Sequence, residues 1–339
     1  MKTIFIVDDN DTNLTMASAT LRKQYHAMTL PSAAKMFELL EKITPDLILL
    51  DIEMPEMDGF EALRQLRTME KFNDIPVMFL TAYTDSEIEA KGFELGAVDF
   101  ITKPFTEPVL LNRIKTHLDI EAIIHERTDQ LNKLQNAIVS VLADVVENRD
   151  MRASGHIERT SEYLKVLIDE MNSRGLYTGE MKDWDIDRMI ASARMHDLGK
   201  ISITDIVVNK PGKLNDEEYE KIKIHALEGE RIIDDIIALT GEGEFLNNAK
   251  IFAGNHHERW DGTGYPRGLK WTEIPLQGRI MAIVDVYDAI VSVRPYKNAF
   301  SHEEAVEQIK KASGTQFDPE IVKIFVDINE KMKEIRESL

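Results

Sequence analysis

The sequence predicts an α/β domain with a doubly wound parallel sheet, followed by a long helix and an all-α domain. Residues 1 to about 105 alternate short apolar runs with amphipathic stretches, a pattern typical of parallel strands joined by helices. Residues 106–150 carry a seven-residue apolar repeat, and the remainder is helical by period with no second strand-rich block. We therefore expect domains at 1–120 and 140–339, joined by a helix over 106–150 that continues the last helix of the first domain.

Composition limits the classes of function open to the chain. Its 339 residues are 43% hydrophobic, carry a net charge of −19 and include no cysteine. Any metal must therefore be held by histidine and carboxylate, and the acidic balance disfavours nonspecific binding to DNA or to an anionic membrane. No apolar run approaches the ~18 residues of a membrane span, and MKTIFIVDDN matches a secretory signal poorly. We expect a cytoplasmic protein that binds neither DNA nor a membrane.

Polar side chains follow four of the predicted strands in the first domain. Asp8 and Asp9 follow the first strand, Asp51 the third, Thr81 the fourth, and Lys103 follows the last. Because the carboxyl ends of parallel strands border one crevice, we expect these side chains to converge there. Paired carboxylates supply the oxygen ligands that Mg²⁺ prefers, and the ion would offset the charge of a phosphoryl group.

Three segments of this domain, LILLDIEMPEMDGF, LTAYTD and FITKPF, resemble the receiver domain of two-component response regulators. The resemblance covers about 120 residues and implies a flavodoxin-like fold that accepts a phosphoryl group from a cognate histidine kinase. The functional residues that it implies are the phosphoacceptor Asp51, a Mg²⁺ site made by Asp8, Asp9 and Asp51, and the switch residues Thr81, Phe100 and Lys103.

Residues 106–150 have the apolar spacing of a coiled coil, interrupted by Arg113 and Arg127. One row has a member at every seventh residue and a second row falls between: Leu110, His117, Ile124, Leu131, Ile138 and Val145, then Ile120, Leu134 and Val141. This repeat predicts a parallel homodimer. A single amphipathic helix packed on its own domain is the alternative.

The all-α domain places histidine and aspartate where a core would favour apolar residues. His196 and Asp197 end the run RMIASARMHDLGK, close to Gly199, which would terminate the helix. His225 lies on an apolar helical face, where a histidine satisfied within the core is the alternative reading.

Asp285 lies inside the apolar run RIMAIVDVYDAIV, where an ionised carboxylate is costly unless it is paired or metal-bound. A buried hydrogen bond to Tyr287 or to the backbone is the alternative. With the adjacent pair in HHERWDGTGYP, four imidazoles and two carboxylates are available to two or more transition-metal ions: His196, Asp197, His225, His256, His257 and Asp285. An aspartate can bridge ions ~3.5 to 4 Å apart, the spacing at which a shared hydroxide attacks phosphorus.

The segments HDLGK, NKPGKL, HHERWDGTGYP, DVYDAI, RPYK and GTQFDP resemble the HD-GYP family of cyclic di-GMP phosphodiesterases, over roughly residues 140–329. The resemblance implies that these six residues are the metal ligands, that Asp197 is the bridge, and that Asp197 and Lys200 serve catalysis. It also implies that the loop around Tyr265 handles substrate and contacts partner proteins. The substrate contacts that we expect are Lys200, Tyr265, Arg294, Lys297 and His156.

One position departs from the family pattern. Some members hold a third metal with a glutamate four residues before the histidine of HIERT, and this chain has Arg152 there. We therefore expect two ions, with iron or manganese favoured and nickel, cobalt or zinc also compatible. His156 is then expected to face a phosphate or to form a hydrogen bond within the site. The expected first product is pGpG, with onward cleavage to GMP slow or absent.

Two explanations account equally well for Glu258, Arg259 and Asp261. These residues stabilise a polar loop by hydrogen bonds, or they have a functional role. Trp260 and Trp271 are predicted to be packing residues.

As a whole, the chain resembles a response regulator whose output domain hydrolyses cyclic di-GMP under the control of Asp51 phosphorylation. One alternative is hydrolysis of another cyclic dinucleotide, such as 3′,3′-cyclic GMP-AMP. The other is a non-catalytic module that binds a dinucleotide, or a diguanylate cyclase, through the loop around Tyr265. Because all six candidate metal ligands are present, the enzyme is favoured.

Overall fold

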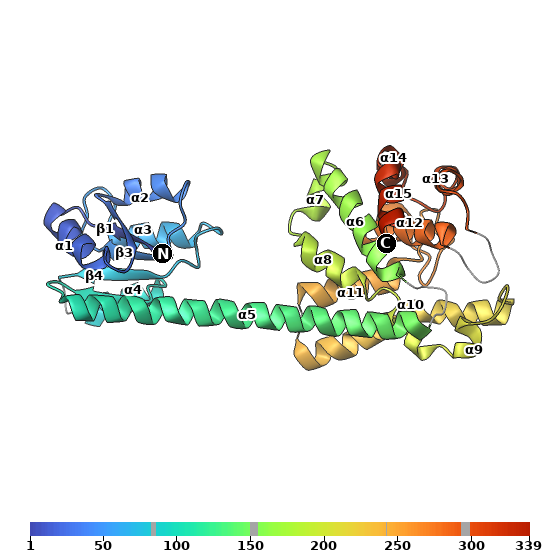
Figure 1. Ribbon diagram of the computed structural model, residues 1–339, viewed down its shortest axis with the longest axis horizontal. Helices are drawn as coiled ribbons and strands as arrows, with labels where there is room; N and C mark the ends of the chain where they lie inside the picture. Colours follow the sequence, from blue (N-terminus) through green and yellow to red (C-terminus); the bar gives the residue numbers. More distant parts are fainter. Residues whose placement is uncertain (83–85, 150–154, 242, 293–298) are drawn as a thin grey trace. The chain divides into compact units, whose positions relative to one another are not determined.

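The computed structural model describes residues 1–82, 86–149, 155–241, 243–292 and 299–339 (Figure 1). Contacts within the chain divide it into two compact units, Met1–Leu131 and Asn132–Leu339, which are described separately. Within these ranges, no helix has the length and apolar character needed to cross a membrane.

The first unit is a five-stranded parallel sheet with strand order β2-β1-β3-β4-β5. Its strands are β1 Thr3–Val7, β2 His26–Leu30, β3 Leu47–Asp51, β4 Val77–Thr81 and β5 Asp99–Thr102. Its connecting helices are α1 Asp11–Leu21, α2 Ala33–Leu40, α3 Gly59–Arg67 and α4 Ser86–Glu94. The predicted doubly wound α/β fold is confirmed.

Side chains of the central strands alternate between two apolar cores, one on each face of the sheet. Phe5 and Val7 pack into one core, whereas Ile4 and Ile6 pack into the other. All the residues of β3 and β4 are buried, as expected for strands covered by helices on both faces. The topological switch point of the sheet lies between β1 and β3, where successive connections leave in opposite directions. The carboxyl ends of these two strands therefore border the crevice of the sheet.

One helix, α5, runs from Glu107 to Arg149, so the predicted long helix is present. Its first turns bury Leu110 and Ile114 in the core of the first unit, and its last turns bury Val139 and Val146 in the second. Leu110 therefore belongs to the core of its own domain, which corrects its assignment to a seam between chains. Leu118 is also buried in the first unit, whereas other apolar residues of the helix are exposed, among them Ile120, Ile123, Ile124, Leu131, Leu134, Ile138 and Val141.

The second unit is built from helices, as predicted. They are α6 His156–Ser173, α7 Thr178–Met181, α8 Ile186–Ala193, η1 Leu198–Ser202, α9 Asp205–Val208, α10 Asp216–Thr240, α11 Glu244–Asn255, η2 Trp271–Glu273, α12 Leu276–Val291, α13 His302–Lys311, α14 Pro319–Asp327 and α15 Asn329–Ser338. Helix α12 lies at the centre of the core, where it packs against α6, α11 and α13.

The segment that carries His196 and Asp197 is a turn rather than the end of a helix. Helix α8 ends at Ala193, and η1 begins at Leu198, so the predicted helical ending at Gly199 is wrong. Gly199 instead allows η1 to approach α10, because a Cβ atom there would lie 1.9 Å from the carbonyl oxygen of His225. This close approach brings Asp197 beside a histidine that is 28 positions away in the sequence, His225.

Candidate metal centre and phosphorylation site

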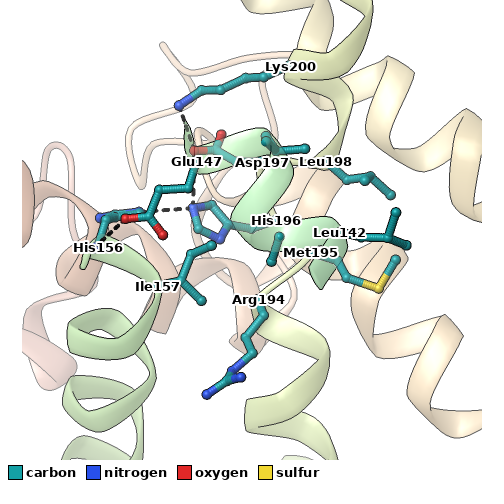
Figure 2. Close-up of a pocket in the computed structure, with 12 residues that line it drawn as sticks. Leu142, Glu147, His156, Ile157, Arg194, Met195, His196, Asp197, Leu198 and Lys200 are labelled. Atoms are coloured by element: carbon teal, nitrogen blue, oxygen red, sulfur yellow. Dashed lines mark hydrogen bonds and ion pairs between the residues drawn. The ribbon is translucent and has the colours of Figure 1, made fainter. Parts of the chain in front are cut away.

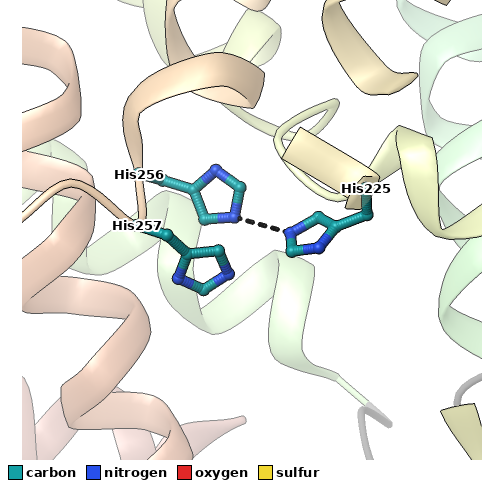
Figure 3. Close-up of side chains that lie close together, drawn as sticks. All are labelled: His225, His256 and His257. Atoms are coloured by element: carbon teal, nitrogen blue, oxygen red, sulfur yellow. Dashed lines mark hydrogen bonds between the residues drawn. The ribbon is translucent and has the colours of Figure 1, made fainter. Parts of the chain in front are cut away.

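Three histidines from α10 and the end of α11 face one another (Figure 3). Their candidate ligand atoms all lie within 4.8 Å of one another, and Nε2 of His225 is 3.3 Å from Nε2 of His256. Nδ1 of His225 lies 2.6 Å from the carbonyl oxygen of Ile222, and Nδ1 of His256 lies 2.9 Å from that of Phe252. Since a carbonyl only accepts, each Nδ1 carries the proton and each Nε2 offers a lone pair to the centre.

A second group of possible ligands is formed by His156, His196 and Asp285, from α6, the turn after α8, and α12. Nε2 of His156 lies 3.4 Å from Nε2 of His196 and 3.6 Å from Oδ1 of Asp285. Nδ1 of His196 lies 2.9 Å from the carbonyl oxygen of Ala193, so this ring is oriented in the same way. The sequence predicts that His156 faces a phosphate or forms a hydrogen bond within the site, and the structure places its Nε2 beside His196 and Asp285.

Asp197 lies between the two groups. Its Oδ2 is 3.5 Å from Nε2 of His196, while its Oδ1 is 3.4 Å from Nε2 of His225. The ammonium of Lys200 is 2.6 Å from Oδ2 (Figure 2). One carboxylate oxygen thus faces each group, which is the arrangement needed to bridge two ions.

The protonation states suit metal binding. Burial lowers the pKa of His256 and His257 well below the usual value, and neighbouring imidazoles lower it further. Burial alone would raise the pKa of Asp197, but Lys200 and His196 hold it well below its usual value. His256 and His257 are therefore held neutral and Asp197 is held ionised, the forms in which these side chains bind a metal.

Asp288 is a site residue that the sequence reasoning missed. It is 2% exposed, accepts a 2.6 Å bond from Nε of Arg159, and lies 2.9 Å from Nδ1 of His156. Burial alone would lower the pKa of His156, but the carboxylates of Asp288 and Asp285 raise it overall. The spacing of polar residues in the sequence could have pointed to Asp288. The first and fourth residues of HIER and of DVYD are polar, and residues three apart lie on the same face of a helix.

The predicted alternative of a hydrogen bond between Asp285 and Tyr287 is not observed. The hydroxyl of Tyr287 is 2.8 Å from Nδ1 of His302, so this tyrosine is paired with α13 rather than with Asp285. Asp285 is half-buried and its side chain is 18% exposed, which fits a residue at the rim of a centre better than one sealed in the core.

The loop after His257 places Tyr265 against the first group. The ring centroids of Tyr265 and His257 are 4.7 Å apart. Glu258 is 2% exposed and accepts backbone N–H bonds from Arg267 and Leu269, at 2.7 and 3.0 Å, so it stabilises the loop.

The remaining polar residues of the loop bond to Thr263: Nε of Arg259 donates to its hydroxyl at 2.9 Å, and that hydroxyl donates to Asp261 at 2.6 Å. Trp260 is half-buried, as a packing residue would be. Trp271 is 60% exposed, so its prediction as a packing residue is wrong. Arg152, Arg294 and Lys297 lie outside the described residues.

In the first unit, the residues predicted to converge at the strand ends lie together. Ligand atoms of Asp8, Asp9 and Asp51 are within 4.8 Å of one another, and the ammonium of Lys103 is 2.7 Å from both Asp8 and Asp51. Asp8 and Asp51 are buried, and burial raises the pKa of Asp51. Thr81 ends β4 at the same edge of the sheet.

Phe100 points into the core, where its ring lies 5.4 Å from that of Phe79 and 5.0 Å from that of Phe93. Gly92 on α4 makes room for it, because a Cβ atom there would lie 2.4 Å from the end of the Phe100 ring. The predicted switch residue is therefore packed directly beneath α4.

Comparison with known proteins identifies two domains in this chain. Residues 4–115 match the response regulator receiver domain, and residues 140–321 match the HD domain. Receiver domains use Mg²⁺ and HD domains bind divalent metal ions, in agreement with the two kinds of ligand cluster.

Similar proteins of known name support the same conclusion. The chain is 39% identical over 339 residues to a probable cyclic di-GMP phosphodiesterase of Vibrio cholerae, covering 96% of this chain and 77% of that protein. It is 33% identical over 356 residues to a cyclic di-GMP phosphodiesterase of Thermotoga maritima, covering 98% and 92%. A 3′3′-cGAMP-specific phosphodiesterase 2 of Vibrio cholerae is 32% identical over 209 residues, covering 62% and 38%. The chain belongs to the family of response regulators that join an N-terminal receiver domain to a C-terminal HD domain of the cyclic di-GMP phosphodiesterase type.

Proposed function

We propose that the chain hydrolyses a phosphodiester bond of cyclic di-GMP at a pair of divalent transition-metal ions in its second unit. The observation that carries this proposal is the position of Asp197, whose two oxygens face two separate groups of ligand atoms. When bound, such ions supply an activated water and stabilise charge that develops on a phosphoryl group. The names of the two relatives with the longest matches support the substrate.

In this proposal each ion has its own ligand group and Asp197 is shared. His225, His256 and His257 hold one ion, and His156, His196 and Asp285 hold the other. This gives His156 a ligand role in place of the phosphate contact predicted from the sequence. Mixed nitrogen and oxygen ligands suit iron or manganese, while nickel, cobalt and zinc are also compatible.

The side chains around the ions orient ligands and substrate. Asp288 holds Nδ1 of His156, which directs Nε2 toward the centre. Lys200 supplies a cation beside Asp197, where a scissile phosphate would carry negative charge. Tyr265 closes the side of the centre next to His257. Arg294 and Lys297 remain predicted substrate contacts.

The first product is proposed to be pGpG, since Arg152 occupies the position at which some family members have a third-metal glutamate. The test is turnover by purified protein reconstituted anaerobically with Fe²⁺ or Mn²⁺, with products resolved by chromatography. We expect pGpG to accumulate and Asp197→Asn to abolish its formation. Rapid stoichiometric release of GMP would contradict the assignment of the product.

A second substrate is favoured by one observation, the similarity to a 3′3′-cGAMP-specific phosphodiesterase. Competition between cyclic di-GMP and 3′,3′-cyclic GMP-AMP in one reaction separates the two. We expect cyclic di-GMP to have the higher kcat/KM. Preferential consumption of 3′,3′-cyclic GMP-AMP would reassign the substrate, and binding of dinucleotide without turnover of either would indicate the non-catalytic module.

In the first unit, we propose that a histidine kinase phosphorylates Asp51 with Mg²⁺ held by Asp8, Asp9 and Asp51. The buried carboxylates and the nearby Lys103 ammonium support this site. We further propose domain boundaries at 1–120 and 140–339 with a linker at 106–150. The contact of a diguanylate cyclase with the loop around Tyr265 stays a prediction.

The exposed apolar row on α5 supports a parallel homodimer. Ile124, Leu131 and Ile138 lie seven residues apart and are 54%, 66% and 50% exposed. Leu134 and Val141, in the second row, are 57% and 60% exposed. Rows of this kind are stable in water when a second helix covers them. The alternative, a helix covered by its own domain, holds for the face of α5 that carries Leu110, Ile114 and Leu118 and for the face that carries Val139 and Val146.

A further inference from the structure

A lysine and two tyrosines lie beside the group His225, His256 and His257. The ammonium of Lys223 is 4.8 Å from the ring centroid of Tyr219 and 5.7 Å from that of Tyr265. Both distances are within the ~6 Å range of a cation–π interaction. The Tyr265 ring is in turn 4.7 Å from His257 and 6.4 Å from His225, so the lysine is one aromatic ring away from candidate metal ligands.

The positions of these side chains follow from the start of α10. Asn215 caps the helix in a reciprocal pair with Glu218, which fixes its first turn. Tyr219 and Lys223 are four residues apart and therefore share a helical face. The loop after His257 then places Tyr265 perpendicular to Tyr219, with centroids 6.5 Å apart and an interplanar angle of 83°.

The lysine is accessible to a ligand. Tyr219 is 47% exposed, and the Lys223 side chain is 28% exposed. Its ammonium is 2.5 Å from Oε1 of Glu220, a side chain that is 69% exposed. An ion pair open to water in this way contributes little, because solvent screens the charges, so a phosphate could displace the glutamate.

The proposed substrate has two phosphodiesters, and only one can lie over the metal pair at a time. We propose that Lys223, positioned by Tyr219 and Tyr265, binds the phosphodiester that is not being cleaved. Lys223 then selects for cyclic dinucleotides over diesters with a single phosphate. This inference rests on the function proposed above.

The test compares two substrates: cyclic di-GMP, and bis(p-nitrophenyl) phosphate, which has one phosphodiester and no second phosphate. The readout is the ratio of kcat/KM for cyclic di-GMP to kcat/KM for the small diester. Since a charge-assisted hydrogen bond is lost for one substrate alone, Lys223→Ala should lower this ratio about tenfold, mainly through KM. Lys223→Arg should restore most of it.

Lys221→Ala is the matched control, because it removes the same charge from an exposed position on the same helix. It should leave the ratio at the wild-type value. An unchanged ratio in Lys223→Ala, including an equal loss for both substrates, would overturn the inference and leave the proposed function intact. A wild-type protein that cleaves the small diester but not cyclic di-GMP would overturn the proposed function and the inference together.

Discussion

Three of the buried histidines in the second unit are oriented through Nδ1 by a backbone carbonyl, and His156 is oriented by Asp288. The difference matters because a carboxylate raises the basicity of the imidazole, while a carbonyl mainly fixes its direction. Asp288 also neutralises Arg159, whose side chain is only 12% exposed. One carboxylate thus stabilises the core and positions a candidate ligand.

Replacing Asp288 with asparagine is expected to weaken both roles. It removes the negative charge that accepts the bonds of the Arg159 guanidinium, a change that costs about 3 kcal/mol in the free energy of unfolding. Metal affinity should fall roughly 10- to 100-fold, as for other changes behind a ligating histidine. Denaturant unfolding and metal titration measure the two effects.

The stabilisation that Asp288 gives the wild type depends on pH. Burial alone would raise the pKa of Asp288, but His156 and Arg159 lower it overall. The stabilisation is therefore present above the unfolded-state pKa of about 3.9 and is lost as pH falls through the lower folded value. Asp327→Asn, which breaks an exposed pair with Arg174, is the control and should cost at most about 1 kcal/mol. Equal stability of the Asp288 and Asp327 variants at neutral pH would contradict this account.

Residue types marked the histidines and Asp197 as candidate ligands, because imidazoles and carboxylates are unusual in helical segments with apolar neighbours. Residue types could not identify Asp288, because Asp285 and Asp288 both lie on α12 and have the same side chain. Only the packing of α6 against α12 distinguishes them. Trp271 was misjudged for a related reason. A large apolar residue favours burial, but its exposure depends on the path of the loop around it.

At the scale of elements, the metal centre depends on how closely η1 packs against α10. Gly199 allows this contact, since any side chain there would overlap the backbone of His225 and Gly229. Periodicity predicted the helices of this region but placed the end of α8 too late. The apolar spacing continues through Met195 and Leu198, which are buried in a turn and in η1 rather than in α8.

Gly199→Ala is therefore expected to separate η1 from α10 and so to move Asp197 away from His225. We expect at least a 100-fold loss of turnover, because a displacement of ~1 Å at a catalytic group has costs of this order. Steady-state kinetics and the thermal midpoint measure the change. Gly179→Ala is the control, since nothing lies within 4 Å of a Cβ atom there. Wild-type activity in Gly199→Ala would show that this contact does not position the centre.

At the scale of the whole molecule, α5 is shared by both units. Its last turns contact the candidate site: Oε1 of Glu147 accepts the backbone N–H of His156 at 2.8 Å. Arg149 binds the carbonyl oxygens of Ile201 and Ile203 and the carboxylate of Asp205. A change in α5 would therefore reach the ligands through residues bonded to its C-terminal end.

From this connection we predict that phosphorylation of Asp51 changes turnover. Cyclic di-GMP hydrolysis should differ between acyl-phosphate-treated wild type and Asp51→Asn given the same treatment, and untreated samples of both serve as controls. The same comparison determines whether phosphorylation raises or lowers turnover. Identical turnover of the treated proteins would contradict gating through Asp51.

The exposed rows of α5 predict that the molecule is a dimer. Leu131→Asp places a charge in the middle of the first row, where burial of an unpaired carboxylate is costly. Sedimentation at micromolar protein should show a dimer for wild type and a monomer for this variant. Asn136→Asp adds the same charge to an exposed residue outside both rows and should remain dimeric. A monomeric wild type would contradict the predicted dimer through α5.

The central claim is that two ions, bridged by Asp197, hydrolyse cyclic di-GMP. The most direct test counts metal ions per chain and measures turnover on the same anaerobic sample, loaded with Fe²⁺ or Mn²⁺. The account predicts about two ions per chain, turnover that rises with the second ion, and loss of both in Asp197→Asn. Full turnover with a single ion, or two bound ions with no turnover in either phosphorylation state of Asp51, would contradict it.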